Sequence, residues 1–152
     1  MDKIDSDQDL RAALDRLTPD QQRRLGCRFV QQVMHLCRDE RVKRAIMTGI
    51  ADTATPSELE DAFRAARARA VSTYTDCGKD TDWLEQADHF VAAAAAAALT
   101  PDEVLLSDRH NRAWKAAVQV RMAVNCAMME DDSADEGQIA RSQYALAAEF
   151  VG

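Results

Sequence analysis

The sequence predicts an all-α protein, a single-domain bundle of six or seven helices over residues 1–152 around an alanine-rich central helix. Three observations predict this fold: helix-start phrases that hold every proline, apolar residues at helical spacing, and a shortage of turn residues. Five glycines and three prolines leave little turn material, which favours long helices over many short strands. There is no alternating run of β-branched residues and no Asn-Gly or Asp-Gly hairpin turn.

The three prolines occupy the same kind of phrase, in which a threonine precedes the proline and Glu or Gln stands third after the threonine. These phrases are Thr18–Gln21, Thr55–Glu58 and Thr100–Glu103. The threonine hydroxyl accepts from the N3 amide, the N3 side chain reaches back to the threonine amide, and proline suits N1. Helices are therefore expected to start at these points. Ser133–Glu136 has the same capping box without proline.

The first half of the chain shows four helical stripes. A short helix has Leu10, Ala13, Leu14 and Leu17 on one side. The helix after Thr18 carries an apolar stripe as far as Leu36 and pauses near Asp39, which can cap a continuation to about Ile50. The helix after Thr55 ends before the turn that contains Gly78, a residue tolerant of positive φ.

The second half contains the predicted central helix, about Asp82 to Leu99. It includes seven consecutive alanines, Ala92 to Ala98, and lacks a polar face after His89. A helix that is apolar on all sides is usually buried. A long helix is expected from Thr100 to about Met129, and a final helix from about Ala134 to Phe150.

The net charge of −7 is unevenly distributed. Residues 1–80 carry 14 basic and 14 acidic side chains, so residues 81–152 carry the whole excess. A local excess of five positive charges spans Arg23 to Arg44. These basic residues alternate with predicted core positions, so they are interpreted as a solvated helix face. A sequence pI of about 4.9 argues against nucleic-acid binding, for which a basic domain is expected.

The cysteines and the termini indicate a soluble cytoplasmic protein. Cys27, Cys37, Cys77 and Cys126 lie far apart and form no Cys-x-x-Cys pair, so reduced and largely buried thiols are expected. The N-terminus has an acidic start rather than a signal peptide. The longest apolar run has ten residues, Phe90 to Leu99, which is too short to span a bilayer.

No catalytic, metal-binding or cofactor-binding residues are predicted. A di-iron bundle needs Glu-x-x-His on two helices, whereas this chain offers only Glu85 and His89 at i,i+4. There is no Gly-x-Ser-x-Gly and no glycine-rich phosphate loop. Cys77 is the one thiol expected in an exposed loop, and Asp76 and Asp80 oppose the effect of Lys79 on its pKa.

The candidate partner-binding residues form an acidic cluster with five carboxylates: Glu130, Asp131, Asp132, Asp135 and Glu136. Acidic side chains suit a helix N-terminus, but Glu130 to Asp132 would follow a helix C-terminus, where the dipole disfavours them. Their placement against this preference hints at a use in binding a basic partner, with a solvated loop as the alternative.

The stretch from Leu36 to Ala68 carries the phrases Asp39-Glu40-Arg41, Ala45-Ile46, Ala51-Asp52, Glu58-Leu59 and Ala65-Ala66, and an alanine-rich helix follows. This resembles a loose group of bacterial all-helical proteins that includes immunity proteins of polymorphic toxin systems. The resemblance covers about Thr18 to Met128 and brings no catalytic residues. It implies a small cytosolic bundle that binds another protein, and an acidic surface would suit a basic toxin.

The leading hypothesis is a non-enzymatic protein-binding module, either an immunity-type inhibitor or another accessory factor. One alternative is a small helical enzyme or ligand carrier, with a pocket beside the alanine-rich helix lined by His89, Trp83 or Trp114. Another is a homodimeric structural module that associates through the alanine face.

Overall fold

The computed structural model describes residues 3–74, 82–105, 111–129 and 136–152. Within these ranges the chain forms seven α-helices, two 3₁₀ helices and no strands. This confirms the predicted all-α bundle. The α-helices are α1 (Asp7–Asp15), α2 (Pro19–Gln31), α3 (Glu40–Ile50), α4 (Pro56–Thr73), α5 (Trp83–Leu99), α6 (Arg112–Met128) and α7 (Glu136–Val151), and the 3₁₀ helices are η1 (Met34–Leu36) and η2 (Asp102–Leu105).

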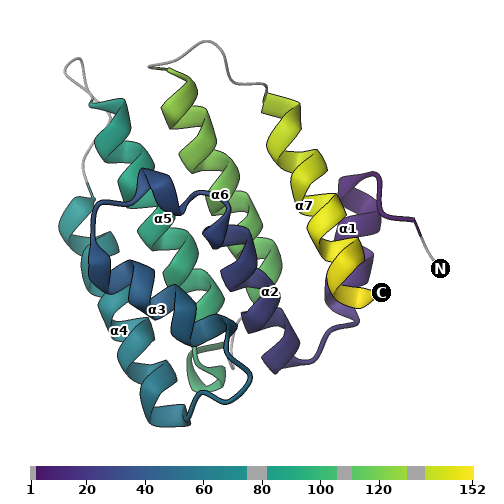
Figure 1. The fold of residues 1–152 in the computed structure, drawn as a ribbon, viewed down its shortest axis with the longest axis horizontal. Helices are drawn as coiled ribbons and strands as arrows, with labels where there is room; N and C mark the ends of the chain where they lie inside the picture. The colour runs from purple at the N-terminus through teal and green to yellow at the C-terminus, as the bar shows by residue number, and fades with distance from the viewer. Residues whose placement is uncertain (1–2, 75–81, 106–110, 130–135) are drawn as a thin grey trace.

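The helices form two layers (Figure 1). In one layer α4, α5, α6 and α7 lie side by side and alternate in direction. In the other layer α3 packs across α4 and α5, and α2 packs across α5 and α6. Helix α1 lies beside α7, so both ends of the described chain are on that side of the molecule. The N-terminal ends of α2 and α4 and the C-terminal end of α5 meet at one end of the bundle.

Two of the three Thr-Pro phrases start helices as predicted. Thr18 accepts from Gln21 N at 3.2 Å, and the Gln21 side chain accepts from Thr18 N at 3.0 Å. Thr55 and Glu58 form the same pair of bonds, at 3.2 and 2.9 Å. These local bonds satisfy backbone N–H groups that have no partner within a helix.

The alanine-rich helix α5 lies at the centre of the bundle, as predicted. Its alanine run is covered by α2, α4 and α6, and Ala92, Ala94, Ala95 and Ala98 are fully buried. Small residues allow this close packing: a Cβ added to Gly26 of α2 would lie 3.0 Å from the Ala98 Cβ and 3.5 Å from the Ala116 Cβ of α6. The chain's own helices therefore bury these alanines.

The third Thr-Pro phrase leads only into the short 3₁₀ helix η2, and the long helix expected from Thr100 to Met129 is wrong. Thr100 is the C-cap of α5, and its hydroxyl donates to Ala96 O at 2.8 Å. After η2 the next helix begins at Arg112 with Asn111 as its N-cap. Asn111 Oδ1 accepts from Ala113 N at 2.9 Å and from Trp114 N at 3.1 Å, and its Nδ2 donates to Leu14 O at 2.8 Å, which joins this helix start to α1.

The second helix is also shorter than predicted. It ends at Gln31, and η1 leads into Asp39, which caps α3 as expected by accepting from Arg41 N at 2.8 Å.

Among the described helices, none has the length and apolar character needed to cross a membrane.

Candidate functional site

An open groove lies at the end of the bundle where the three Thr-Pro phrases meet, and its volume is about 920 Å³. All three prolines line it, Pro19 from α2, Pro56 from α4 and Pro101 from the turn after α5. We call it the Thr-Pro groove. Its apolar lining comes from α4, the end of α5 and η2, namely Leu59, Phe63, Leu99 and Val104.

Two arginines, the partly buried Arg23 and the buried Arg112, hold the frame of this groove by binding the C-terminal ends of other helices. Arg23 donates from Nε to Gly49 O at 3.1 Å and from Nη2 to Ala51 O at 3.3 Å, and it pairs with Asp20 at 2.8 Å. The last carbonyls of a helix have no partner within the helix, and cations favour that end. Arg23 thereby fixes the end of α3 against the start of α2.

Arg112 performs the same task for α5. Its side chain is 7 % exposed, and its Nε donates to Thr100 O at 2.6 Å while the guanidinium pairs with Asp102. The Arg112 backbone N–H donates to Gln22 Oε1 at 3.3 Å, which joins α6 to α2. Bonds among α2, α3, α5 and α6 thus hold the α2 and α5 sides of the groove in place.

The rims of the groove also carry charges that are not used in this frame. Arg67 of α4 and Glu103 of η2 are exposed, and neither has a partner in the described part of the chain. Arg64 of α4 pairs with Glu60 at 2.7 Å. The groove therefore combines an apolar lining with a cation from α4 and an anion from η2 that are unpaired within the described residues.

The groove is lined by four carboxylates and by two threonines, Thr18 and Thr100. The described residues that line it include no Ser, Cys, His, Lys or Tyr. Three of its four carboxylates, Asp20, Glu60 and Asp102, are in ion pairs with arginines. In addition, no group of three or more His, Cys, Asp or Glu side chains within the described ranges could hold a metal ion.

A second polar cluster lies away from the groove, where α4, α5 and the segment before α3 meet. Asp88 is 4 % exposed and accepts from Arg69 Nη2 at 2.5 Å and from Arg38 N at 3.4 Å. Arg69 Nε is 3.8 Å from Asp39 Oδ2. Each charge faces an opposite charge, so this cluster serves to join three segments.

Cys37 and His89 border this cluster. Burial raises the pKa of the Cys37 thiol to about 11, which keeps it protonated. Burial also lowers the pKa of His89, whose Nδ1 lies 3.0 Å from Thr73 Oγ1. The neutral imidazole thus has a hydroxyl partner on α4.

The acidic cluster predicted as a partner-binding site lies almost wholly outside the described residues. This applies to Glu130, Asp131, Asp132 and Asp135. Glu136 is the first residue of α7, but its side chain is not among those described. Cys77 also lies outside the described ranges.

The aromatic and histidine residues expected beside a pocket do not line the Thr-Pro groove. Trp83 and His89 are in the N-terminal half of α5, whereas the groove lies at its C-terminal end. Trp114 of α6 has the guanidinium groups of Arg11 and Arg121 at 5.0 and 5.5 Å from its ring centroid. The groove residues were missed by sequence reasoning, although the repeated Thr-Pro phrase was a signal for them.

No protein-family model, curated protein or solved structure matches this chain. The resemblance to immunity proteins therefore remains a prediction. The geometry of the described residues carries the functional argument.

Proposed function

We propose that the protein is a non-enzymatic binding module that holds a segment of another protein in the Thr-Pro groove. The observation that carries this proposal is the groove itself, an open and preformed hollow of about 920 Å³ with an apolar floor. Concave, largely apolar and preformed surfaces are where proteins usually bind ligands. A rigid frame also lowers the entropy cost of binding.

The two rims specify the kind of segment that fits. An amphipathic helix places its apolar side chains along one stripe and can carry opposite charges on the two sides of that stripe. The stripe would contact Leu59, Phe63 and Val104, with an acidic side chain facing Arg67 and a basic one facing Glu103. We therefore assign an amphipathic peptide helix of this pattern as the occupant.

An immunity-type inhibitor and an accessory factor are two cytoplasmic forms of this role. The five carboxylates from Glu130 to Glu136 support a partner that is basic overall, because complementary charge accelerates association. A toxin with a positively charged surface and an amphipathic segment would satisfy both features.

A small-molecule carrier is the second candidate, and the size of the groove favours it. A volume of about 920 Å³ is within the range of small-molecule sites. Native mass spectrometry of the protein purified from its own cell separates the two candidates. A carrier shows a stoichiometric added mass that disappears on denaturation, whereas a peptide-binding module does not.

Peptide selection tests the protein-binding proposal. A random library of displayed peptides is selected against the full chain, and the enriched peptides are measured against two variants. Val104→Glu changes a groove residue that is 57 % exposed. Val71→Glu changes a valine of α4 outside the groove that is 69 % exposed. Since both side chains face solvent, both variants are expected to fold.

We expect enriched peptides with an apolar helical stripe that bind the parent and Val71→Glu equally and bind Val104→Glu at least about tenfold more weakly. The proposal is wrong if no peptide is enriched, or if the enriched peptides bind both variants as tightly as the parent.

A further inference from the structure

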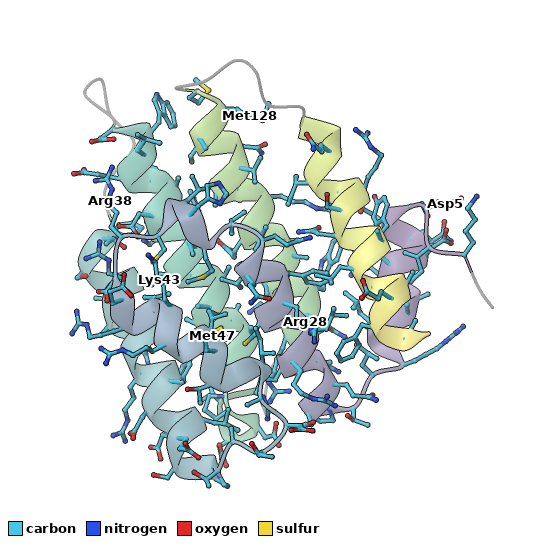
Figure 2. All side chains as sticks on the ribbon, viewed as in Figure 1. Asp5, Arg28, Arg38, Lys43, Met47 and Met128 are labelled. Carbon is cyan, nitrogen blue, oxygen red and sulfur yellow. The ribbon has the colours of Figure 1, made fainter. Side chains whose placement is uncertain are left out.

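A basic face lies on α2 and α3, in the layer that covers α5 and α6. Its members are six cations and three anions: Arg24, Arg28, Arg38, Arg41, Lys43, Arg44, Asp20, Asp39 and Glu40. Figure 2 shows Arg28, Arg38, Lys43 and Met47 spread across this side of the molecule. We call it the α2–α3 face. Its charge is opposite to the net charge of −7 of the whole chain.

Half of these cations are held by neighbouring carboxylates, and half are available. Arg24 pairs with Asp20, Arg41 with Asp39 and Lys43 with Glu40, at 3.0 to 3.3 Å. The side chains of Arg28, Arg38 and Arg44 are exposed and have no ion pair within the described ranges. Arg44 lines a shallow depression opposite Glu58 and Asp61 of α4, beyond ion-pair distance.

An exposed methionine lies among these cations. Met47 of α3 is 59 % exposed, and its sulfur lies 4.0 Å from Gln31 Nε2 of α2, so it sits where the two helices adjoin. Methionine is flexible and polarizable, and both methionine and arginine are enriched in protein interfaces. The face therefore has an apolar centre with charge around it.

We propose that the α2–α3 face binds an acidic surface of another protein, with Met47 against an apolar side chain and Arg28 and Arg44 against carboxylates. The charge pattern supports this choice. An acidic partner is repelled by a chain of net charge −7 and attracted by this one face, so charge selects the docking orientation. This surface shares only Asp20, at its edge, with the Thr-Pro groove, and the proposal does not depend on the proposed function.

A nucleic acid is the competing occupant. The composition of the α2–α3 face disfavours a nucleic acid. The face has carboxylates among its cations and a methionine at its centre, whereas phosphate binding requires a continuous basic surface. The sequence pI of about 4.9 points the same way.

Fluorescence anisotropy with two labelled probes tests the proposal. One probe is a glutamate-rich peptide that carries leucine at helical spacing, and the other is an oligothymidylate of equal charge. The full chain is compared with Arg28→Glu/Arg44→Glu and with the control Lys3→Glu/Lys115→Glu, which changes net charge equally at exposed sites outside the face. Met47→Ala is compared with Met129→Ala, since these methionines are 59 % and 60 % exposed.

We expect the parent protein to bind the peptide more tightly than it binds the oligothymidylate. The affinity for the peptide should fall as the salt concentration is raised. Arg28→Glu/Arg44→Glu should weaken peptide binding by about tenfold or more, and Met47→Ala by about threefold, with little change in either control. The proposal is overturned if the oligothymidylate binds more tightly, if the lysine control loses as much affinity as the arginine variant, or if the parent does not bind the peptide.

Discussion

Arg69 donates a hydrogen bond to the buried carboxylate of Asp88 at 2.5 Å and thereby joins α4 to α5. The same carboxylate accepts the Arg38 backbone N–H, so the segment before α3 is fixed to the same point. A buried charge is tolerated only when it is paired and hydrogen-bonded. This pair therefore holds three segments that are distant in the sequence.

Asp88→Ala should lower the free energy of unfolding by about 3 kcal/mol, because the half-buried Arg69 loses its partner and the Arg38 N–H loses its acceptor. Urea unfolding followed by circular dichroism measures the change. Glu85→Ala, at an exposed position on the same helix, is the control and should change stability by less than about 0.5 kcal/mol. Equal stability of the two variants would show that the pair has no structural role.

Ala95→Leu should destabilise the protein by about 1–3 kcal/mol, because Ala95 is fully buried between neighbouring helices and has no room for a larger side chain. Ala68→Leu, at an exposed position on α4, is the matched control and should have almost no effect. Thermal unfolding of both variants measures the difference. A tolerated leucine at residue 95 would contradict the central position of α5.

Asp7 should make stability depend on pH below its ordinary pKa of 3.8. Its hydrogen bond from Arg121 lowers the pKa of the carboxyl, and partial burial opposes this shift. In acid the unfolded chain takes up a proton that folded Asp7 does not, so the stabilisation is complete above pH 3.8 and is lost as pH falls through the lower, folded pKa.

Asp7→Asn should therefore cost stability at neutral pH, by about 1 kcal/mol or less because the pair is half-exposed. The difference between the parent and this variant should shrink as pH falls below 3.8. Urea unfolding at a series of pH values measures it, with the exposed Asp52→Asn as the control. A difference that stays constant in acid would refute the ionic role of Asp7.

Cys27 and Cys37 should resist alkylation in the folded protein. Burial raises the pKa of Cys27 to about 12 and that of Cys37 to about 11, so the reactive thiolate is scarce near neutral pH. Mass spectrometry after brief treatment with iodoacetamide should find both unmodified in the native chain and both modified in urea. Rapid labelling of native Cys27 would mean that its helix α2 opens readily.

The helix starts whose signals lie within a few residues were predicted correctly. The start predicted at Thr100 was wrong because a distant residue, Arg112, binds there. Thr18 and Thr55 begin helices because each capping box is complete within four residues. Thr100 has the same phrase, yet its carbonyl accepts from Arg112, and it ends α5 instead. The same phrase therefore precedes an α-helix at Thr18 and Thr55 and follows one at Thr100, where Arg112 binds the threonine carbonyl.

The Thr-Pro groove could not be predicted from the sequence either, because residues that are distant along the chain form it. The groove exists because α2, α4 and α5 bring their ends together, and residues far apart in the sequence hold its frame, such as Arg112 and Gln22, which are 90 residues apart and join α6 to α2. Helical spacing left either Gln143 or Tyr144 on the core side of the last helix, and Gln143 is the one that is fully buried, because Ala117 O and Arg121 satisfy its amide.

The most direct test of the central claim is photo-crosslinking from the groove in the cell that produces the protein. A benzophenone amino acid is placed at Val104 in one variant and at Val71, outside the groove, in another. We predict that residue 104 alone cross-links one protein, through a segment with an apolar helical stripe, and that Phe63→Ala weakens this cross-link. Equal cross-linking from both positions, or none from residue 104, would contradict a binding role for the Thr-Pro groove.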